Sequence, residues 1–123
     1  MALTWQRTLT AKLADGTDLN QVAFERDTSY QSLTFQKVHS SVLSLTDTNN
    51  TTVTLPAGNT GLLFIEATSD LNVTIDGGNQ PLQLRPQVSE TAMVMVENSS
   101  TTSIVVAQPA AGTCTVYVTA ASR

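Results

Sequence analysis

Apolar and polar residues alternate with a period of two along most of the chain. This is the spacing of a half-buried β-strand, because successive side chains of a strand point to opposite faces. The first example is ALTWQRTLTAKL near the N-terminus, in which Arg7 is the one charged residue on the apolar face. The other residues on that face are Leu3, Trp5, Leu9, Ala11 and Leu13.

A longer pattern then occurs three times, at 41–55, 62–75 and 92–107. In each, an alternating stretch leads through a short loop of Asn, Asp, Ser and Thr into a second stretch rich in β-branched residues. Asn, Asp and Ser favour turns because their side chains bond the neighbouring backbone. The pattern predicts three β-hairpins.

Proline and glycine separate these units, in PAGNTG, DGGNQP and QPAAGT. Proline lacks a donor for the strand ladder and glycine permits positive φ, so we expect the chain to leave one sheet at these places. The stretch Leu19 to Gln31 fits a short helix, a strand or an extended loop. We predict one all-β domain over 1–123, a β-sandwich or jelly roll of about eight to ten strands with almost no helix.

Composition supports a folded chain that avoids charge. Of 123 residues, 41% are hydrophobic and only 13% are charged, against about 25% charged in ordinary domains. Threonine and serine, about a quarter of the chain, take the place of the charged residues. The net charge is −4 and the six basic residues are scattered, which argues against nucleic-acid binding and a cationic membrane-surface helix.

The N-terminus, the apolar runs and the single cysteine indicate in which cellular compartment the protein is made. No apolar run approaches the ~20 residues of a membrane span, and the N-terminus has no apolar stretch typical of a secretory signal peptide. With Cys114 alone, an intrachain disulfide is impossible, and its strand-like setting predicts a buried, inert thiol. We therefore expect a protein made in the cytoplasm and not bound to a membrane.

The chain offers little to do chemistry with. His39 is the only histidine and no G-x-S-x-G motif is present, so we predict no enzyme. One His and one Cys cannot form a zinc site, and DGTD and DTNN lack the acidic spacing of a calcium loop. DGGN lacks the lysine and helix of a phosphate loop. We expect no catalytic residue, no metal and no cofactor.

Two features leave alternatives open. AMVMVE, at 92–97, is apolar on both faces, so this strand is either central to a layered fold or part of a subunit contact. Trp5 and Tyr30 could present an aromatic platform to a sugar. Trp5, however, shares a face with Leu3 and Leu9, which favours burial in this domain or against a partner.

The segments TTVTLPAGNTGLLFIEATSDLNVTIDGG and TAMVMVENSSTTSIVVAQPAAGTCTVYV resemble small β-sandwich virion proteins of tailed bacteriophages, of the head decoration (cement) type. The resemblance implies a structural, non-enzymatic virion protein that binds and stabilises the head lattice. Its implied partners are the major capsid protein or other virion proteins, and its implied state is a homo-oligomer, a trimer. The alternative is a tail or host-surface module that binds carbohydrate.

The N-terminal strand suggests where a partner binds. An unpaired arginine is costly in a dry core, yet Arg7 shares a face with Leu3 and Trp5. We hypothesise that residues 1–7 form a contact arm in which these three side chains meet a neighbouring subunit or the capsid. Alternatively, Leu3 and Trp5 belong to the core and Arg7 reaches solvent past the sheet edge.

Overall fold

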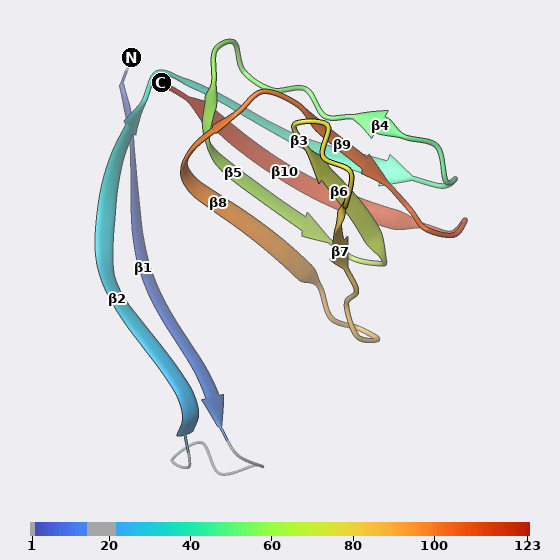
Figure 1. Ribbon diagram of the computed structural model, residues 1–123, viewed down its shortest axis with the longest axis horizontal. Helices are drawn as coiled ribbons and strands as arrows, with labels where there is room; N and C mark the ends of the chain where they lie inside the picture. The colour runs from blue at the N-terminus through green and yellow to red at the C-terminus, as the bar shows by residue number, and fades with distance from the viewer. Residues whose placement is uncertain (1, 15–21) are drawn as a thin grey trace. The chain divides into compact units, whose positions relative to one another are not determined.

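The structure is a computed structural model that describes residues 2–14 and 22–123, with side chains described for 2–5, 33–97 and 99–123 (Figure 1). The chain divides into two compact units, Leu3–Thr34 and a second one that contains Phe35–Arg123. All the regular secondary structure of the described residues is β-strand, which confirms the all-β prediction. No helix there is long and apolar enough to cross a membrane.

The first unit is a two-stranded sheet of β1 (Leu3–Ala14) and β2 (Val22–Phe35). Parallel neighbours need a crossover of about a dozen residues or more, and only residues 15–21 join these strands, so the pair is an antiparallel hairpin. Residues 22–31 belong to β2, so this part of the stretch Leu19 to Gln31 is a strand and not a helix or a loop. The expected Asp15-Gly16 turn and residues 19–21 lie outside the described residues.

The second unit contains two four-stranded antiparallel sheets. We call β3-β10-β5-β8 the long sheet and β4-β9-β6-β7 the short sheet. The long sheet comprises β3 (Lys37–Leu45), β5 (Thr60–Ala67), β8 (Ala92–Thr101) and β10 (Cys114–Ser122). The short sheet comprises β4 (Thr51–Thr52), β6 (Leu71–Ile75), β7 (Leu82–Leu84) and β9 (Ile104–Ala107).

The strands of this unit pair in a nested order. The first pairs with the last, β3 with β10, and then β4 with β9, β5 with β8 and β6 with β7. The pairs β10–β5 and β9–β6 complete the two sheets. This is an antiparallel ribbon rolled into two layers, which is the jelly-roll topology.

The prediction of three hairpins is wrong: the strands form, but the two strands of each predicted hairpin do not pair with each other. The connections β3–β4, β5–β6 and β8–β9 each carry the chain from the long sheet to the short sheet. A polar loop reverses the chain equally well within a sheet or between two sheets, and the distant pairing partners decide which occurs. DGGNQP, expected to be a place where the chain leaves its sheet, instead joins the neighbours β6 and β7.

The β6–β7 turn is also hydrogen-bonded to the β8–β9 connection, where the chain passes from one sheet to the other. Asp76 and Gly77 have φ of 52° and 66°, and Gly78 N donates to Ile75 O at 3.1 Å, as in a type I′ turn. The Asp76 carboxylate accepts bonds from Thr102 N (2.7 Å), Thr102 Oγ1 (2.8 Å) and Ser103 N (3.0 Å) at the β8–β9 corner. These bonds, the Thr102 backbone bond first, lower the pKa of Asp76.

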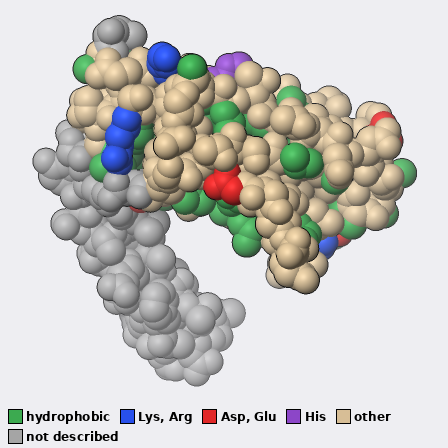
Figure 2. All heavy atoms as spheres, turned by 45° about the horizontal axis from the view of Figure 1, so that its top comes forward, with side chains coloured by type: hydrophobic (Ala, Val, Ile, Leu, Met, Phe, Trp, Pro, Cys, Tyr) green, Lys and Arg blue, Asp and Glu red, His purple; other side chains and the backbone are tan. Residues whose placement is uncertain are grey.

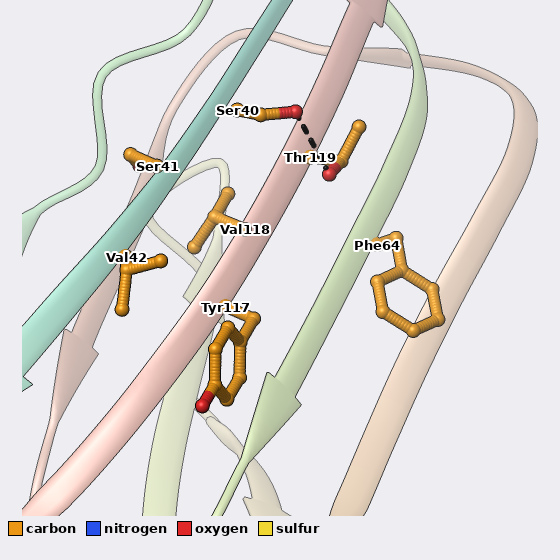
Figure 3. Close-up of a pocket in the computed structure, with 7 residues that line it drawn as sticks. All are labelled: Ser40, Ser41, Val42, Phe64, Tyr117, Val118 and Thr119. Atoms are coloured by element: carbon orange, nitrogen blue, oxygen red, sulfur yellow. Dashed lines mark hydrogen bonds between the residues drawn. The ribbon is translucent and has the colours of Figure 1, made fainter.

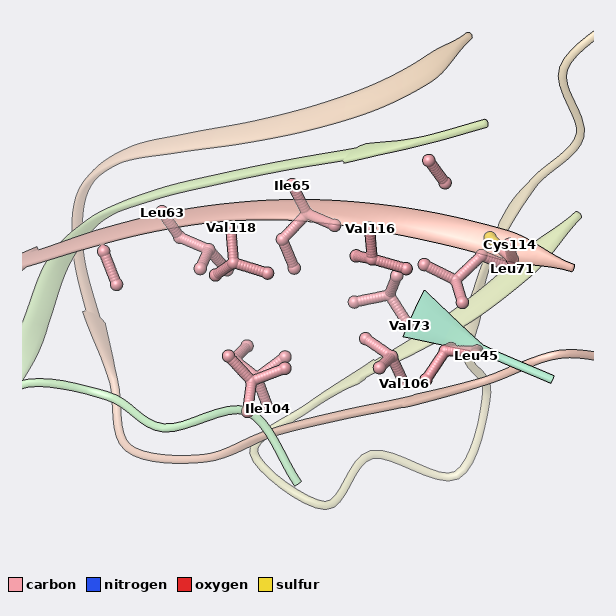
Figure 4. Close-up of a cluster of buried hydrophobic side chains, with 13 residues drawn as sticks. Leu45, Leu63, Ile65, Leu71, Val73, Ile104, Val106, Cys114, Val116 and Val118 are labelled. Carbon is pink, nitrogen blue, oxygen red and sulfur yellow. The ribbon is translucent and has the colours of Figure 1, made fainter. Parts of the chain in front are cut away.

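The hydrophobic core fills the space between the two sheets (Figure 4). Leu63, Ile65, Val116 and Val118 point inward from the long sheet, and each is at most 2% exposed. They face side chains of the short sheet, among them Val73, Ile104 and Val106. Cys114 is buried in the same cluster, as predicted, and its Sγ lies 3.6 Å from Ser69 O.

The start of the second unit is anchored by an aromatic ring. Phe35 is 1% exposed, and Gln36 N donates to Ser122 O at 2.9 Å. A Cβ on Gly61 would stand 3.0 Å from Cε1 of Phe35, closer than side chains normally approach. Glycine at 61 therefore leaves room for the ring that fixes the chain at the entry to β3.

Candidate interaction surface

The outer face of the long sheet carries an unusual set of side chains. Val116 and Val118 face the core, so Tyr117 between them points outward, and the register places it opposite Val42 on β3 and Glu66 on β5. Glu66 in turn lies opposite Met93 on β8. Apolar side chains therefore occupy three of four positions in a row that crosses the whole sheet. We call this side of the sheet the outer face.

Exposed apolar side chains concentrate on this face. Of the six large hydrophobic residues exposed in the described part of the chain, four lie here: Val38 (48%), Val42 (63%), Met93 (55%) and Tyr117 (43%). The other two, Leu82 and Val88, belong to β7 and to the loop after it. Contiguous exposed apolar surface in a folded protein marks an interaction site more often than it occurs by accident.

A shallow pocket of about 240 Å³ lies in the middle of the outer face (Figure 3). Phe64 and Tyr117 contribute aromatic rings, and Ser40 and Thr119 contribute hydroxyls that bond each other at 3.1 Å. Ser41, Val42 and Val118 complete the lining. The lining contains no Asp, Glu, Lys, Arg or His, so the pocket suits apolar contact and hydroxyl hydrogen bonding.

Charge is sparse around this surface. Glu66 is the central charged group of the outer face, and its carboxylate accepts a bond from Thr91 Oγ1 at 3.3 Å. Figure 2 also shows few charged side chains: the acidic and basic ones form only small, separate spots on the described surface in that view. Few charges need to be desolvated when a partner covers such a surface, which favours protein contact.

The predicted contact residues lie in the other unit. Leu3 and Trp5 are both half-buried on β1, and Trp5 makes an interaction within the chain. The backbone of Arg7 belongs to β1, but its side chain lies outside the described residues. The arm expected over residues 1–7 is thus the first part of a strand that continues to Ala14, and its contact with a partner stays a prediction.

His39 has a structural setting. It lies on β3 opposite Ala120, is half-buried, and shares its side of the strand with Leu43 and Leu45, which pack on the core. Among the described residues no group of three or more His, Cys, Asp or Glu side chains is placed to hold a metal ion.

The structure decides one alternative that the sequence left open. AMVMVE lies on β8, which is an edge strand of the long sheet and not a central one. Val94 and Val96 pack against the core, whereas Met93 and Met95 lie on the outer face. A central position in the sheet is therefore excluded, and contact of this strand with a subunit stays a prediction.

Sequence reasoning missed the outer face as a whole. The signal was present in AMVMVE and in CTVYV, where apolar residues occupy both parities of a strand. What the sequence could not supply was that these strands, together with SVLSL, belong to one sheet. The outer face exists only because residues 42, 64, 93 and 117 come from four neighbouring strands.

No protein-family model, no curated protein and no solved structure matches this chain.

Proposed function

We propose that the protein is a bacteriophage virion component, a capsid decoration or cement protein that binds the head lattice and stabilises it. The observation that carries this proposal is the outer face of the long sheet, where four large apolar side chains are exposed on a rigid jelly roll. A cement protein needs a stiff body and a contact surface that requires little ordering on binding. The partner is the major capsid protein or another virion protein, and the location is the virion.

The β1–β2 hairpin supports the same role. A two-stranded sheet is at best marginally stable in water by itself, yet these strands are 12 and 14 residues long. Packing against a partner surface would stabilise such a hairpin. In the proposal, Leu3, Trp5 and Arg7 on β1 contact a capsid subunit or a neighbouring copy.

The first test uses the outer face. Purified protein is mixed with empty capsids of the phage whose genome encodes the chain and is centrifuged, and bound protein is measured in the pellet. Tyr117→Ser, on the central strand β10, should weaken binding about tenfold or more, the loss of ~1.4 kcal/mol or more expected of a central aromatic anchor. Leu82→Ser, on an equally exposed residue of β7 (45% against 43%), should leave binding unchanged. Equal binding by both variants, or no binding by the wild type, contradicts the proposal.

The second test removes residues 1–7. If they form the contact arm, the shortened protein stays folded and loses binding to capsids or to its own copies. If the melting temperature instead falls by ~10 °C or more, as loss of several kcal/mol would cause in a domain of this size, the residues belong to a core. His39→Ala should fold and bind like the wild type, because catalysis has no part in the proposal.

The pocket favours a second candidate, a tail or host-surface module that binds carbohydrate. Phe64 and Tyr117 lie beside the Ser40–Thr119 hydroxyl pair, and sugars are commonly held by ring stacking together with hydroxyl hydrogen bonds. NMR titration with a panel of neutral oligosaccharides tests this. Saturable shifts of Phe64 and Thr119 signals that Tyr117→Ala abolishes would favour this candidate over capsid binding.

A further inference from the structure

We infer that copies of this protein associate edge to edge through the long sheet, with β8 of one copy pairing with β3 of the next to close a ring. The inference deepens the assembly role and, for its biological setting, rests on the proposed function. The partner is a second copy of this chain. The contact combines strand pairing along the edges with apolar contact between exposed side chains beside them.

The four sheet edges differ in how well they are protected. Natural proteins protect edge strands by keeping them short or by placing proline and charged residues there. In the short sheet, β4 has two residues, and β7 has three and lies between Pro81 and Pro86. Arg85, next to β7, donates to Leu71 O at 3.1 Å and to Asn72 Oδ1 at 2.7 Å. Both edges of the short sheet are therefore closed to a partner strand.

The edge strands of the long sheet are longer and less protected. β3 is paired with β10 over nine consecutive residues, and β8 is paired with β5 without interruption from Ala92 to Glu97. Neither β3 nor β8 contains proline, and their only Lys, Arg, Asp or Glu residues are Lys37 at the start of β3 and Glu97 on β8, so 38–45 and 92–96 carry none. Among the described strands, β3 and β8 have one neighbour each, so one side of each backbone has no strand partner. Each edge also exposes an apolar side chain on the outer face, Val42 at 63% and Met93 at 55%.

The directions of the two edges make one copy complementary to the next. Because every neighbouring pair in the sheet is antiparallel, β3 and β8 run in opposite directions. β8 placed beside β3 of a second copy therefore continues the antiparallel ladder of the sheet. This contact is heterologous and uses both open edges of every copy, so it can close as a ring. A two-fold contact at one edge would leave the other open, and two-fold contacts at both edges would build an open filament.

The test uses lysine substitutions, which discourage edge pairing. Wild-type protein should have the mass of a closed ring, three times 13.1 kDa for a trimer, by light scattering after size exclusion. Met93→Lys on β8 and Val42→Lys on β3 should each reduce the mass to that of one copy. Val88→Lys adds the same charge at a loop residue that is 95% exposed, and should keep the ring. Circular dichroism confirms that each variant is folded.

A mixture of the two edge variants distinguishes the heterologous β8–β3 contact from a two-fold contact. Val42→Lys keeps a free β8 and Met93→Lys keeps a free β3, so the mixture should form dimers of two copies and nothing larger. Dimers formed by either variant alone would mean a two-fold contact and would overturn the inference, as would a mixture that stays monomeric. A monomeric wild type at about 100 µM also overturns it.

The proposed function and this inference can fail separately. Tyr117→Ser lies on a central strand and should lose capsid binding while keeping the wild-type mass. A wild-type monomer that still sediments with capsids would contradict only the ring. A ring that does not sediment with capsids would contradict only the cement role.

Discussion

The two sheets of the jelly roll both contribute to the core but differ on their outer sides. Between them, Leu63 and Leu71 are both completely buried, one from the long sheet and one from the short sheet. Outside, the long sheet exposes four large apolar side chains and has two edge strands of nine and ten residues, whereas the strands of the short sheet are two to five residues long and expose one large apolar side chain, Leu82. Both sheets therefore contribute to the core, whereas the exposed apolar side chains are concentrated on one of them.

The largest expected effect tests whether the sheets share one core. Leu63→Ala in the long sheet and Leu71→Ala in the short sheet each leave a cavity where a leucine is 0% exposed. Each should lower the free energy of unfolding by about 2–5 kcal/mol, measured by urea denaturation at one fixed protein concentration. A loss below about 1 kcal/mol for Leu71→Ala alone would mean that the short sheet is a loosely attached layer.

The next effect concerns the loops that join the sheets. Gln108 is 4% exposed, and its Nε2 donates to Asp47 O at 3.1 Å and to Gly112 O at 2.9 Å. It thereby ties the β3–β4 connection to the β9–β10 connection. Gln108→Ala leaves both carbonyls without this donor and should cost about 1–3 kcal/mol of unfolding free energy. Gln83→Ala, on an exposed residue of β7, is the matched control and should cost much less.

A smaller, pH-dependent effect is expected where the short sheet holds the β8–β9 corner. Hydrogen bonds from Thr102 and Ser103 lower the pKa of Asp76 in the folded protein below its ordinary value of 3.8. The unfolded chain therefore binds this proton more readily, so the carboxylate stabilises the fold above pH 3.8 and loses that effect as the pH falls through the native pKa.

Asp76→Ala should accordingly lower the melting temperature at pH 7, and the difference from the wild type should shrink below pH 3.8. Asp70→Ala, an exposed aspartate at the β5–β6 connection, serves as the control. A difference that stays constant from pH 7 to pH 3 would show that the charge of Asp76 does not stabilise the corner.

The smallest expected effect is a gain in stability within the long sheet. The hydroxyl of Thr60 is buried and has no hydrogen-bond partner among the described residues. Thr60→Val replaces it with a methyl group of similar shape and should raise the unfolding free energy by up to about 1 kcal/mol. Thr54→Val, at an exposed residue, is the comparison. A loss of stability at 60 would reveal a partner for the hydroxyl, such as a bound water.

Much of the fold followed from the sequence because strand formation is a local property. The alternation at 41–45, 71–75 and 114–118 predicted both the strands and their inward faces, and those residues alternate in burial as expected. The burial of Cys114 followed from the same pattern. For residues 22–31 the sequence lacked a decisive period, and the strand there is defined by pairing between β1 and β2.

The sequence by itself determined that this chain forms strands, where most of them lie and that few charges interrupt them. Only the tertiary structure decided which strands are neighbours. Short connections such as 46–50, 68–70 and 102–103 fix a reversal of direction but not the sheet to which the next strand belongs. That choice depends on pairs such as β3 with β10, whose residues are 69 to 85 positions apart in the chain, and on burying the apolar sides of both sheets against each other. The outer face and the two open edges are products of those distant pairings, so no local pattern could reveal them.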